Sequence, residues 1–360
     1  MLEITNISDF YKQEKPLPII DVRSPGEFEK GHIPSAFNIP LFTNEERAQV
    51  GTVYKQQSRE RAIELGNKLV APKLQFYIEE SFNVAPDGRA MVHCWRGGMR
   101  SQAFAQHLLD NGFKEVMLLK NGYKSYRRMV VALFQKPWNL VVIGGYTGSG
   151  KTHVLHQLEK MGYQVIDLEG VAQHKGSAFG GIGQPQQPTS EQFENNLFEE
   201  YGQMDPTQPV FIEDESLNIG KVNMPVPLFH QIRNATDYFL EVPREERAHL
   251  LASDYSFQDV EPLNAAIQRI SKKLGGLETQ ESLKLLEQRK FYEVALRVLH
   301  YYDKSYLKGL QNRDSSKTII IPCNSTDIKV NVEKILSHLK LNHKILKTQP
   351  INEHHKINQI

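Results

Sequence analysis

The segment that most constrains the fold of this chain spans residues 138–162 and reads WNLVVIGGYTGSGKTHVLHQLEKMG. It places the pattern G-x-x-x-x-G-K-[ST] between an apolar run and a stretch with helical periodicity. A strand, a glycine-rich loop and a helix in this order form a phosphate-binding loop, in which backbone N–H groups and the helix N-terminus surround an anion. In such a loop the lysine contacts the outer phosphates and the hydroxyl of the last residue binds Mg²⁺. The expected phosphate-binding residues are Gly145, Gly148, Ser149, Gly150, Lys151 and Thr152.

Short apolar runs alternate with helical patterns on both sides of a boundary near residue 136. This alternation predicts an α/β fold with two parallel sheets, each covered by helices. We therefore expect one domain at 1–135, with a polar and mostly helical insertion at about 43–88, and a second domain at 136–340. The second domain should carry added helices at about 244–312, and a polar tail should follow at 341–360.

Composition excludes several classes of protein. No apolar run approaches the roughly 20 residues that a membrane-spanning helix needs, and the first residues lack the pattern of a signal peptide. We expect a cytoplasmic protein without membrane contact. The two cysteines, Cys94 and Cys323, form neither a disulfide framework nor a zinc pattern. The formal net charge of +1 neither favours nor excludes a nucleic-acid partner.

Acidic residues at predicted strand ends are candidates to orient a metal ion or a phosphate. A third strand of the second domain, PVFI, runs directly into Glu213, Asp214 and Glu215, where a magnesium-orienting acid would lie. The alternative is a solvated strand end or a helix cap. Asp167 ends the preceding strand and is a further candidate.

Arg244 and Arg247 lie three residues apart in PREERAHLL, a spacing that puts both on one side of a helix. They either cover a bound phosphate or belong to a solvated helix face.

Cys94 follows a short apolar run and precedes Trp-Arg-Gly-Gly-Met-Arg-Ser and a helical pattern. Such a loop can turn its N–H groups toward the sulfur, and Arg96, Arg100 and the helix N-terminus favour thiolate over thiol. A lowered pKa suits a nucleophile or a carrier of sulfur or selenium. Cys323, in IIIPCN, is expected to be a packing residue.

PIIDVRSPGEFEKGHIPSAFNIP followed by HCWRGGMRS resembles a rhodanese domain, whose cysteine carries a persulfide. The resemblance implies catalysis by Cys94 and mainly structural roles for the signature residues Asp21, Arg23, Glu27, His32, Pro34 and Ala36. One feature departs from the pattern, because Arg100 lies six residues after Cys94 where many single-domain rhodaneses have five. HC-x5-R is also the signature of cysteine phosphatases, some of which share this fold, and the wider ring suits a tetrahedral anion.

The whole chain resembles the bacterial tRNA 2-selenouridine synthase family. Besides the two loops, the similar segments are GTVYKQQSRERAIELG, LEGVAQHKGSAFGGIGQPQQPTSEQFENNL, IEDESLNIGKVNMP and KLGG…YYDKSY. The resemblance implies a transferase that replaces sulfur by selenium in the wobble 2-thiouridine of tRNA. It implies selenophosphate and geranyl diphosphate as co-substrates, with S-geranyl-2-thiouridine as an intermediate. Cys94 would become a selenylated cysteine beside Arg100, and the phosphate loop would bind one of the two anions without a requirement for ATP. An enzyme that supplies selenophosphate would be a partner.

Candidate contacts with tRNA are three basic clusters and three aromatic residues. The clusters are Lys55, Arg59, Arg61 and Lys68 in the insertion, Lys124, Arg127 and Arg128 near the boundary, and Lys272, Lys273, Arg289 and Lys290 in the late helices. Trp95, Tyr123 and Tyr126 could stack on an unpaired base, although packing is the expected role of each. Two other functions stay open: a rhodanese-fold cysteine phosphatase fused to a kinase-like domain, and a nucleotide-gated selenium or sulfur carrier without catalysis of its own.

Overall fold

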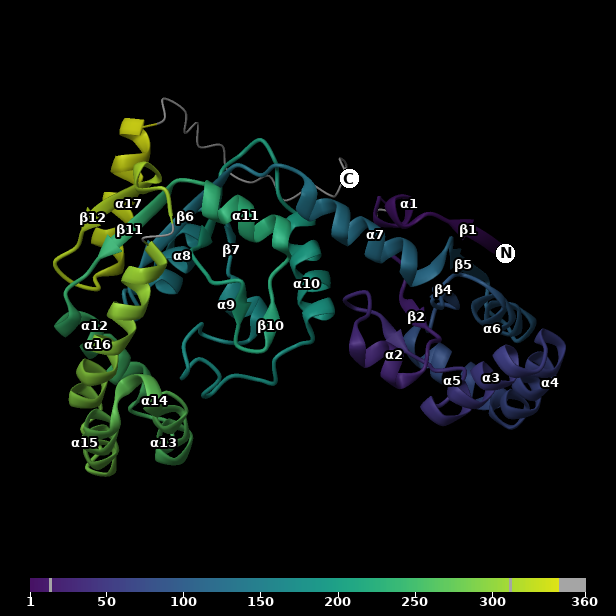
Figure 1. Cartoon of the computed structure of the whole chain (residues 1–360). Coiled ribbons are helices and arrows are strands. Elements are labelled where there is room, and N and C mark those ends of the chain that lie inside the picture. Colours follow the sequence, from purple (N-terminus) through teal and green to yellow (C-terminus); the bar gives the residue numbers. More distant parts are fainter. Residues whose placement is uncertain (13–14, 311–312, 343–360) are drawn as a thin grey trace. The chain divides into compact units, whose positions relative to one another are not determined.

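The computed structural model describes residues 1–12, 15–310 and 313–342. These residues form two compact units. The first unit contains Met1–Leu133 together with Glu194–Gln203, and the second contains Phe134–Phe193 and the described residues from Met204 onward. Each unit is built around its own parallel sheet (Figure 1).

The sheet of the first unit has the strand order β1-β5-β4-β2-β3, with every pair parallel. Its strands are β1 (Leu2–Thr5), β2 (Ile19–Asp21), β3 (Phe37–Asn38), β4 (Arg89–His93) and β5 (Glu115–Leu119). The central strands are short and almost continuously apolar, as expected for strands covered on both faces. Helices α1 (Ile7–Tyr11), α2 (Pro25–Lys30), α6 (Met99–Asp110) and α7 (Gly122–Gln135) connect or follow them.

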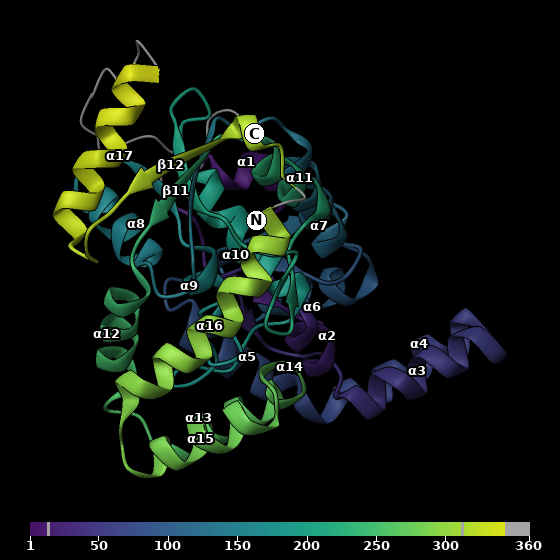
Figure 2. The same cartoon turned by 60° about the vertical axis from the view of Figure 1, so that its left-hand side comes forward.

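The insertion predicted at about 43–88 is helical and consists of α3 (Asn44–Gln56), α4 (Arg59–Val70), a 3-10 turn (Ala71–Lys73) and α5 (Leu74–Val84). Helix α3 begins with a capping box, because Thr43 and Glu46 each accept a hydrogen bond from the backbone of the other. Ser58 caps α4 by accepting from the N–H of Arg61 at 3.2 Å. Helices α3 and α4 lie side by side (Figure 2).

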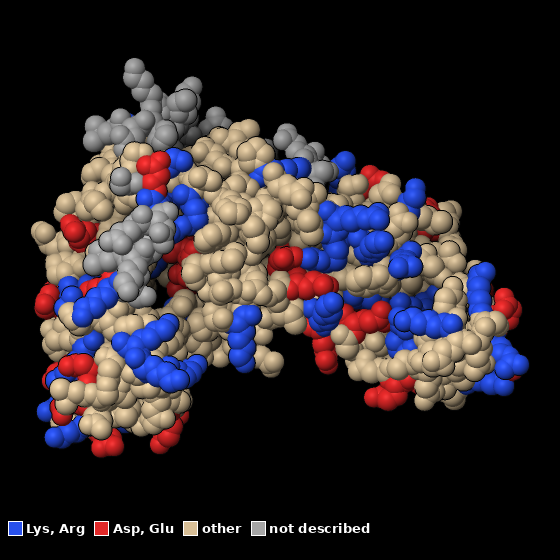
Figure 3. Space-filling view, in the orientation of Figure 1, with Lys and Arg blue, Asp and Glu red and all other residues tan. Residues whose placement is uncertain are grey.

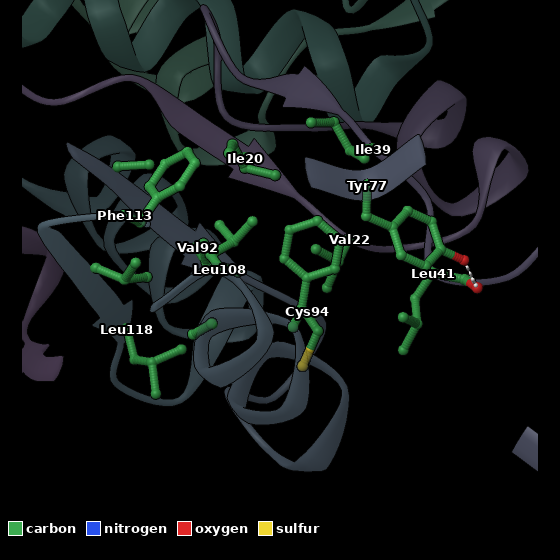
Figure 4. Packing of buried hydrophobic residues seen from close by; sticks show 14 of the residues in the cluster. Ile20, Val22, Ile39, Leu41, Tyr77, Val92, Cys94, Leu108, Phe113 and Leu118 are labelled. Atoms are coloured by element: carbon green, nitrogen blue, oxygen red, sulfur yellow. Dashed lines mark hydrogen bonds between the residues drawn. The ribbon is translucent and has the colours of Figure 1, made fainter. Parts of the chain in front are cut away.

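The core of the first unit lies between its sheet and the helices of the insertion. Ile20, Val92 and Leu118, from three neighbouring strands, are buried in one cluster. Tyr77 of α5 joins this cluster and donates its hydroxyl to the Leu41 carbonyl at 2.8 Å. Figure 4 shows Cys94 in the same cluster, with its sulfur at the cluster's edge. Cys94 is therefore anchored in the apolar core of the unit.

Helix α10 (Ser190–Gly202) lies late in the sequence, yet most of it groups with the first unit. The Asn195 side chain donates to the His32 carbonyl and to the Tyr123 hydroxyl, both at 2.8 Å. Arg127 of α7 forms an ion pair with Glu194. These polar contacts connect residues more than 60 positions apart and have no local signal in the sequence.

The sheet of the second unit has the order β12-β11-β6-β8-β7, again all parallel. Its strands are β6 (Leu140–Gly145), β7 (Gln164–Ile166), β8 (Val210–Glu213), β11 (Asp237–Glu241) and β12 (Thr318–Pro322). The remaining elements around the sheet are α8 (Lys151–Lys160), α9 (Leu168–Ala172), α11 (Val226–Asn234), α17 (Ile328–Asn342) and the small hairpin of β9 (Asn218–Ile219) and β10 (Val222–Asn223). The central position of β6 places the loop that follows it at the carboxyl edge of the sheet, where open α/β folds bind ligands.

The added helices predicted at 244–312 are α12 (Arg244–Tyr255), α13 (Val260–Arg269), α14 (Ser271–Leu274), α15 (Gly276–Glu287) and α16 (Phe291–Leu310). They pack around a second apolar cluster that includes Leu263, Ile267 and Val298. Helices α12 and α16 lie against each other. Apart from its first two residues, the polar tail predicted at 341–360 lies outside the described part of the chain.

Candidate functional site

Cys94 directly follows β4, the central strand of the first sheet, and its loop leads into α6. The loop lies against the turn between β5 and α7. Tyr123, at the start of α7, donates its N–H to the Cys94 carbonyl at 2.9 Å. Gly97 has a φ of +63°, and a Cβ there would lie 2.7 Å from the Leu119 carbonyl oxygen. The glycine at this position is therefore required by the close approach of the two loops.

The pKa of the Cys94 thiol is lowered although the side chain is only 3% exposed. Burial by itself raises the pKa, but hydrogen bonding by Ser101, the positive charge of Arg100 and the N–H groups of Ser101 and Arg96 outweigh it. The Ser101 hydroxyl lies 3.3 Å from the sulfur. Sequence reasoning predicted the loop N–H groups and the arginine and missed the serine, which the HCxxxxxRS spacing contains.

Arg100 is held by Glu27, whose carboxylate accepts from its Nη1 at 2.8 Å. The same carboxylate accepts from the Ser24 N–H at 3.2 Å and lies 3.5 Å from Nε of Arg47. Burial raises the pKa of Glu27, yet its bonds to Arg100 and Ser24 lower it overall, so the acid stays ionised. Glu27 thus positions Arg100 beside the thiol, a role that the rhodanese signature alone did not reveal. The side chain of Arg96 is exposed, and its backbone N–H helps to lower the pKa of Cys94.

The residues Asp21, Arg23 and His93 form a buried polar group behind the loop. Arg23 and Asp21 make a fully buried ion pair at 2.6 Å, and Arg23 also donates to the Gly31 carbonyl at 2.8 Å. The Arg23 guanidinium lies 3.8 Å from the centre of the Tyr123 ring. This arrangement suits the structural role expected of Asp21 and Arg23.

A cavity of about 1000 Å³ lies between the Cys94 loop, the insertion helices and α6. Its wall is mainly apolar and includes Cys94 itself. The apolar and small lining residues are Leu41, Phe42, Val50, Gly51, Ala62, Ile63, Gly66, Val70, Leu74, Gly98, Met99, Ala103 and Phe104. Lys30, Arg47, Lys55, Arg59, Arg96 and Arg100 also line it. No sequence pattern predicted this cavity.

The phosphate-binding loop of the second unit has the backbone that its glycines permit, with φ of +79° at Gly148 and +82° at Gly150. Lys151 begins α8, and its Nζ donates to the Gly145 carbonyl at 3.2 Å. The six predicted residues therefore run from the last residue of β6, through the connecting loop, to the first two residues of α8.

Arg247 supports this loop from outside. It is 3% exposed, and its Nη1 donates both to the Thr147 carbonyl at 3.1 Å and to Oδ1 of Asp303 at 2.9 Å. Its Nη2 donates to Oδ2 of Asp303 at 3.0 Å. Arg244 lies 3.0 Å from the same carboxylate. The expectation of a solvated helix face is wrong for Arg247, because α16 covers it and supplies its counter-ion.

The acid that contacts the phosphate loop is Glu169, which accepts from the Thr152 hydroxyl at 3.0 Å. Glu213 is buried and accepts from the Glu169 N–H at 2.7 Å. Burial, followed by the negative charge of Glu169, raises the pKa of Glu213 well above its usual range. Sequence reasoning selected Glu213 and missed Glu169.

The other predicted acids have different partners. Asp167 caps α9 through the Gly170 N–H at 2.7 Å and lies 2.8 Å from His156. Asp214 is bound by Arg313 and Arg233, both at 2.9 Å, and by the Tyr306 hydroxyl.

A magnesium ion at the phosphate-binding loop would need the phosphates of a bound anion as additional ligands. Among the described residues, no three His, Cys, Asp or Glu side chains are grouped so as to hold a metal. Thr152 and Glu169 supply two neighbouring oxygens, and Mg²⁺ commonly binds through one or two protein oxygens together with substrate phosphates and water. These two residues therefore fit a magnesium ion that arrives with an anion.

The basic clusters occupy different environments. Lys55 and Arg59 line the cavity, Lys68 pairs with Glu64 at 2.9 Å, and Arg127 is engaged by α10. Tyr123 and Tyr126 are buried and cannot stack on a base, in keeping with the expected packing role, whereas Trp95 is half-buried beside the Cys94 loop. The exposed members of the clusters are Lys55, Arg59, Arg61, Lys68, Lys124, Arg128, Lys272, Lys273, Arg289 and Lys290. On the face shown in Figure 3, Lys and Arg side chains are numerous over the first unit.

Comparisons with known proteins agree with the division of the chain into two α/β units. Residues 7–129 match the model of the rhodanese-like domain, and residues 138–335 match that of the tRNA 2-selenouridine synthase AAA domain. A tRNA 2-selenouridine synthase of Nitrosomonas europaea is 36% identical over 82% of this chain and 90% of its own length. The chain belongs to the tRNA 2-selenouridine synthase family. The corresponding enzyme of Hydrogenovibrio crunogenus is 38% identical over 76% of this chain and 80% of its own length.

Membership of the tRNA 2-selenouridine synthase family confirms the predicted fold, a rhodanese-like unit followed by a P-loop α/β unit with added helices. A crystal structure of the N-terminal domain of a putative ATP/GTP binding protein from Clostridium difficile 630 is 37% identical over 36% of this chain and 98% of its own length, with a TM-score of 0.32. In the described part of the chain, no helix combines the length and apolar character needed to cross a membrane.

Proposed function

We propose that this protein replaces sulfur by selenium at C2 of the wobble 2-thiouridine of tRNA, with selenophosphate as donor. The reaction passes through S-geranyl-2-thiouridine, which the same chain makes from geranyl diphosphate. The observation that carries the proposal is a thiol of lowered pKa in the wall of an apolar cavity, in a chain that also has a phosphate-binding loop. The names of its relatives support the selenouridine product and the tRNA substrate.

The geranyl step uses the phosphate-binding loop. The C2 sulfur attacks C1 of geranyl diphosphate, the C–O bond breaks, diphosphate leaves with the electron pair, and the N3 proton of the base passes to solvent. Lys151, the loop N–H groups and the N-terminus of α8 offset the charge of the leaving group. A loop of this kind holds consecutive phosphates, which favours the diphosphate over the single phosphorus of selenophosphate as its ligand.

The selenium step uses Cys94. A loop of six residues ending in Arg100 suits a single tetrahedral anion, so we assign selenophosphate to the first unit. The Cys94 thiolate attacks phosphorus, the P–Se bond breaks, and selenium leaves with the electron pair as hydrogen selenide. The selenide attacks C2 of the S-geranyl base, geranylthiolate leaves with the C–S electron pair, and water hydrolyses the phosphocysteine to phosphate. These steps, from attack on phosphorus to hydrolysis of the phosphocysteine, need no oxidant or reductant.

A selenylated Cys94 is the alternative that the rhodanese resemblance implies. In that step the thiolate attacks selenium, phosphorus leaves as phosphite, and a thiol must cleave the S–Se bond to release the product. Selenophosphate labelled at phosphorus separates the two, because only attack at phosphorus transfers the label to Cys94 and yields phosphate.

The proposed function is tested with the full chain, 2-thiouridine tRNA, geranyl diphosphate and selenophosphate, with the wobble base read by mass spectrometry. Cys94→Ala should lose selenation and keep geranylation, and Lys151→Ala should lose geranylation. A fused phosphatase and kinase would instead turn over a generic phosphate ester through Cys94 without tRNA. A carrier without catalysis of its own would load Cys94 and form no modified base. Selenation that continues in Cys94→Ala contradicts the proposed role of the thiol.

A further inference from the structure

We propose that the cavity beside Cys94 binds the geranyl chain of S-geranyl-2-thiouridine and thereby brings C2 of the base to the Cys94 loop. The inference rests on the proposed function, because the S-geranyl base is the substrate of its second step. It assigns the recognition of this intermediate to α3, α4, α5 and α6, none of which belongs to the phosphate-binding loop.

The chemistry of the wall selects an apolar ligand. Val50 of α3, Ile63 of α4 and Leu74 of α5 all line the cavity, and none offers a hydrogen-bonding side chain. Selenophosphate, a small polyanion, needs hydrogen-bond donors, and the Cys94 loop supplies them through Arg100 and the N–H groups of Arg96 and Ser101. The rest of the roughly 1000 Å³ suits a hydrocarbon chain, since burial of apolar surface is favourable.

Two glycines in helix interiors enlarge the cavity. Gly51 of α3 and Gly66 of α4 both line it, although glycine is unfavourable inside a helix. A Cβ at Gly66 would already lie 3.3 Å from Cζ of Phe42, so a larger side chain there would displace the wall. The space is thus maintained by residues that cost helix stability.

The charges around the cavity suit a chain that is attached to a polyanion. Among the described lining residues six are Lys or Arg, and Glu27 is the single carboxylate, already engaged by Arg100. Lys55, Arg59 and Arg96 are exposed, so phosphates on either side of a modified nucleotide can reach them.

An apolar cavity in the second unit is much smaller. It lies beside Thr147 in the second unit, measures about 50 Å³, and has room for only a few water molecules. Its size does not fit a ten-carbon chain, whereas the cavity beside Cys94 has room for one.

The first experiment measures binding without turnover. Alkylation of Cys94 by iodoacetamide is followed by peptide mass spectrometry in the full chain, with S-geranyl-2-thiouridine nucleoside, 2-thiouridine or geranyl diphosphate added. The geranylated nucleoside should slow the alkylation at least about tenfold, since the chain supplies many apolar contacts, and 2-thiouridine should not. Equal protection by 2-thiouridine, or protection by geranyl diphosphate alone, would overturn the inference.

A matched pair of variants adds a structural control. Ala103→Trp on α6 fills the cavity from an exposed position, whereas Gln102→Trp places the same side chain on the same helix outside the lining. Protection should disappear in Ala103→Trp and persist in Gln102→Trp. Unchanged protection in Ala103→Trp contradicts the assignment.

The second experiment uses tRNA that already carries the S-geranyl group. Its selenation should fall about tenfold or more in Ala103→Trp and stay unchanged in Gln102→Trp. Suppose that the geranylated nucleoside protects Cys94 in the wild-type chain, but that the chain forms no selenouridine. The proposed function then fails and the cavity assignment stands. If selenouridine forms at equal rates from S-methyl and S-geranyl tRNA, the cavity assignment fails and the proposed function stands.

Discussion

The hydroxyl oxygen of Ser101 lies 3.3 Å from the sulfur of Cys94 and 3.1 Å from the carbonyl oxygen of Gly98. Ser101 has one hydroxyl proton for these two acceptors. In the thiol form, the S–H group donates to Ser101, and Ser101 donates to Gly98. In the thiolate form, the hydroxyl turns to the sulfur. The serine can therefore satisfy both states of a buried nucleophile.

Ser101→Ala should raise the pH at which Cys94 becomes reactive. The pKa of Cys94 is lowered partly by the Ser101 side chain, so its removal reduces the fraction of thiolate at a given pH. The rate of alkylation by iodoacetamide against pH gives the midpoint directly. In the parent chain this midpoint should lie below the value of about 8.5 for a free cysteine. A midpoint that does not move in Ser101→Ala would show that the hydroxyl has no part in stabilising the thiolate.

Two substitutions at the neighbouring ion pair should move the same midpoint in opposite directions. Arg100→Ala removes a positive charge and should raise it, whereas Glu27→Gln leaves Arg100 uncompensated and should lower it. Glu27→Gln should nevertheless slow selenation about tenfold, because the arginine is no longer held in place. Identical shifts in the two variants would contradict the assigned roles.

The sequence predicted those parts of both sites that depend on short segments. The strand before Cys94, the loop arginines and the whole phosphate-binding loop were evident because each has a local pattern. The partners of these residues were not evident, since they come from distant elements: Asp303 is 56 residues from Arg247, and Glu27 is 73 from Arg100. The cavity beside Cys94 depends on side chains from four helices, and no periodicity in one helix reveals what faces it.

Arg247→Ala should destabilise the second unit more than Arg244→Ala. Both arginines contact Asp303, but Arg247 is buried and Arg244 is 38% exposed in its side chain. Arg247→Ala leaves the buried Asp303 with the more exposed Arg244 as its remaining partner, so its cost should exceed the about 0–1 kcal/mol of an exposed pair and reach at most the about 3–5 kcal/mol of a broken buried pair. Denaturant unfolding of the full chain measures both losses. Equal losses would mean that solvent reaches Asp303 as freely as it reaches Arg244.

Glu213 should make the second unit less stable as the pH rises. Its pKa is raised well above the usual value, first by burial and then by the charge of Glu169, so the folded state retains a proton that the unfolded state releases. For such a group the stabilisation is fully present below the ordinary glutamate pKa of about 4.3, and it is lost as the pH rises through the folded pKa. The contribution can change by up to about 1.4 kcal/mol per pH unit over that window.

Glu213→Gln removes the titration and keeps an oxygen that can accept from the Glu169 N–H. Unfolding free energies measured from pH 5 upward should therefore depend less on pH in Glu213→Gln. Glu159→Gln, on the exposed side of α8, should follow the parent curve. A parent-like slope in Glu213→Gln would place the retained proton on another group.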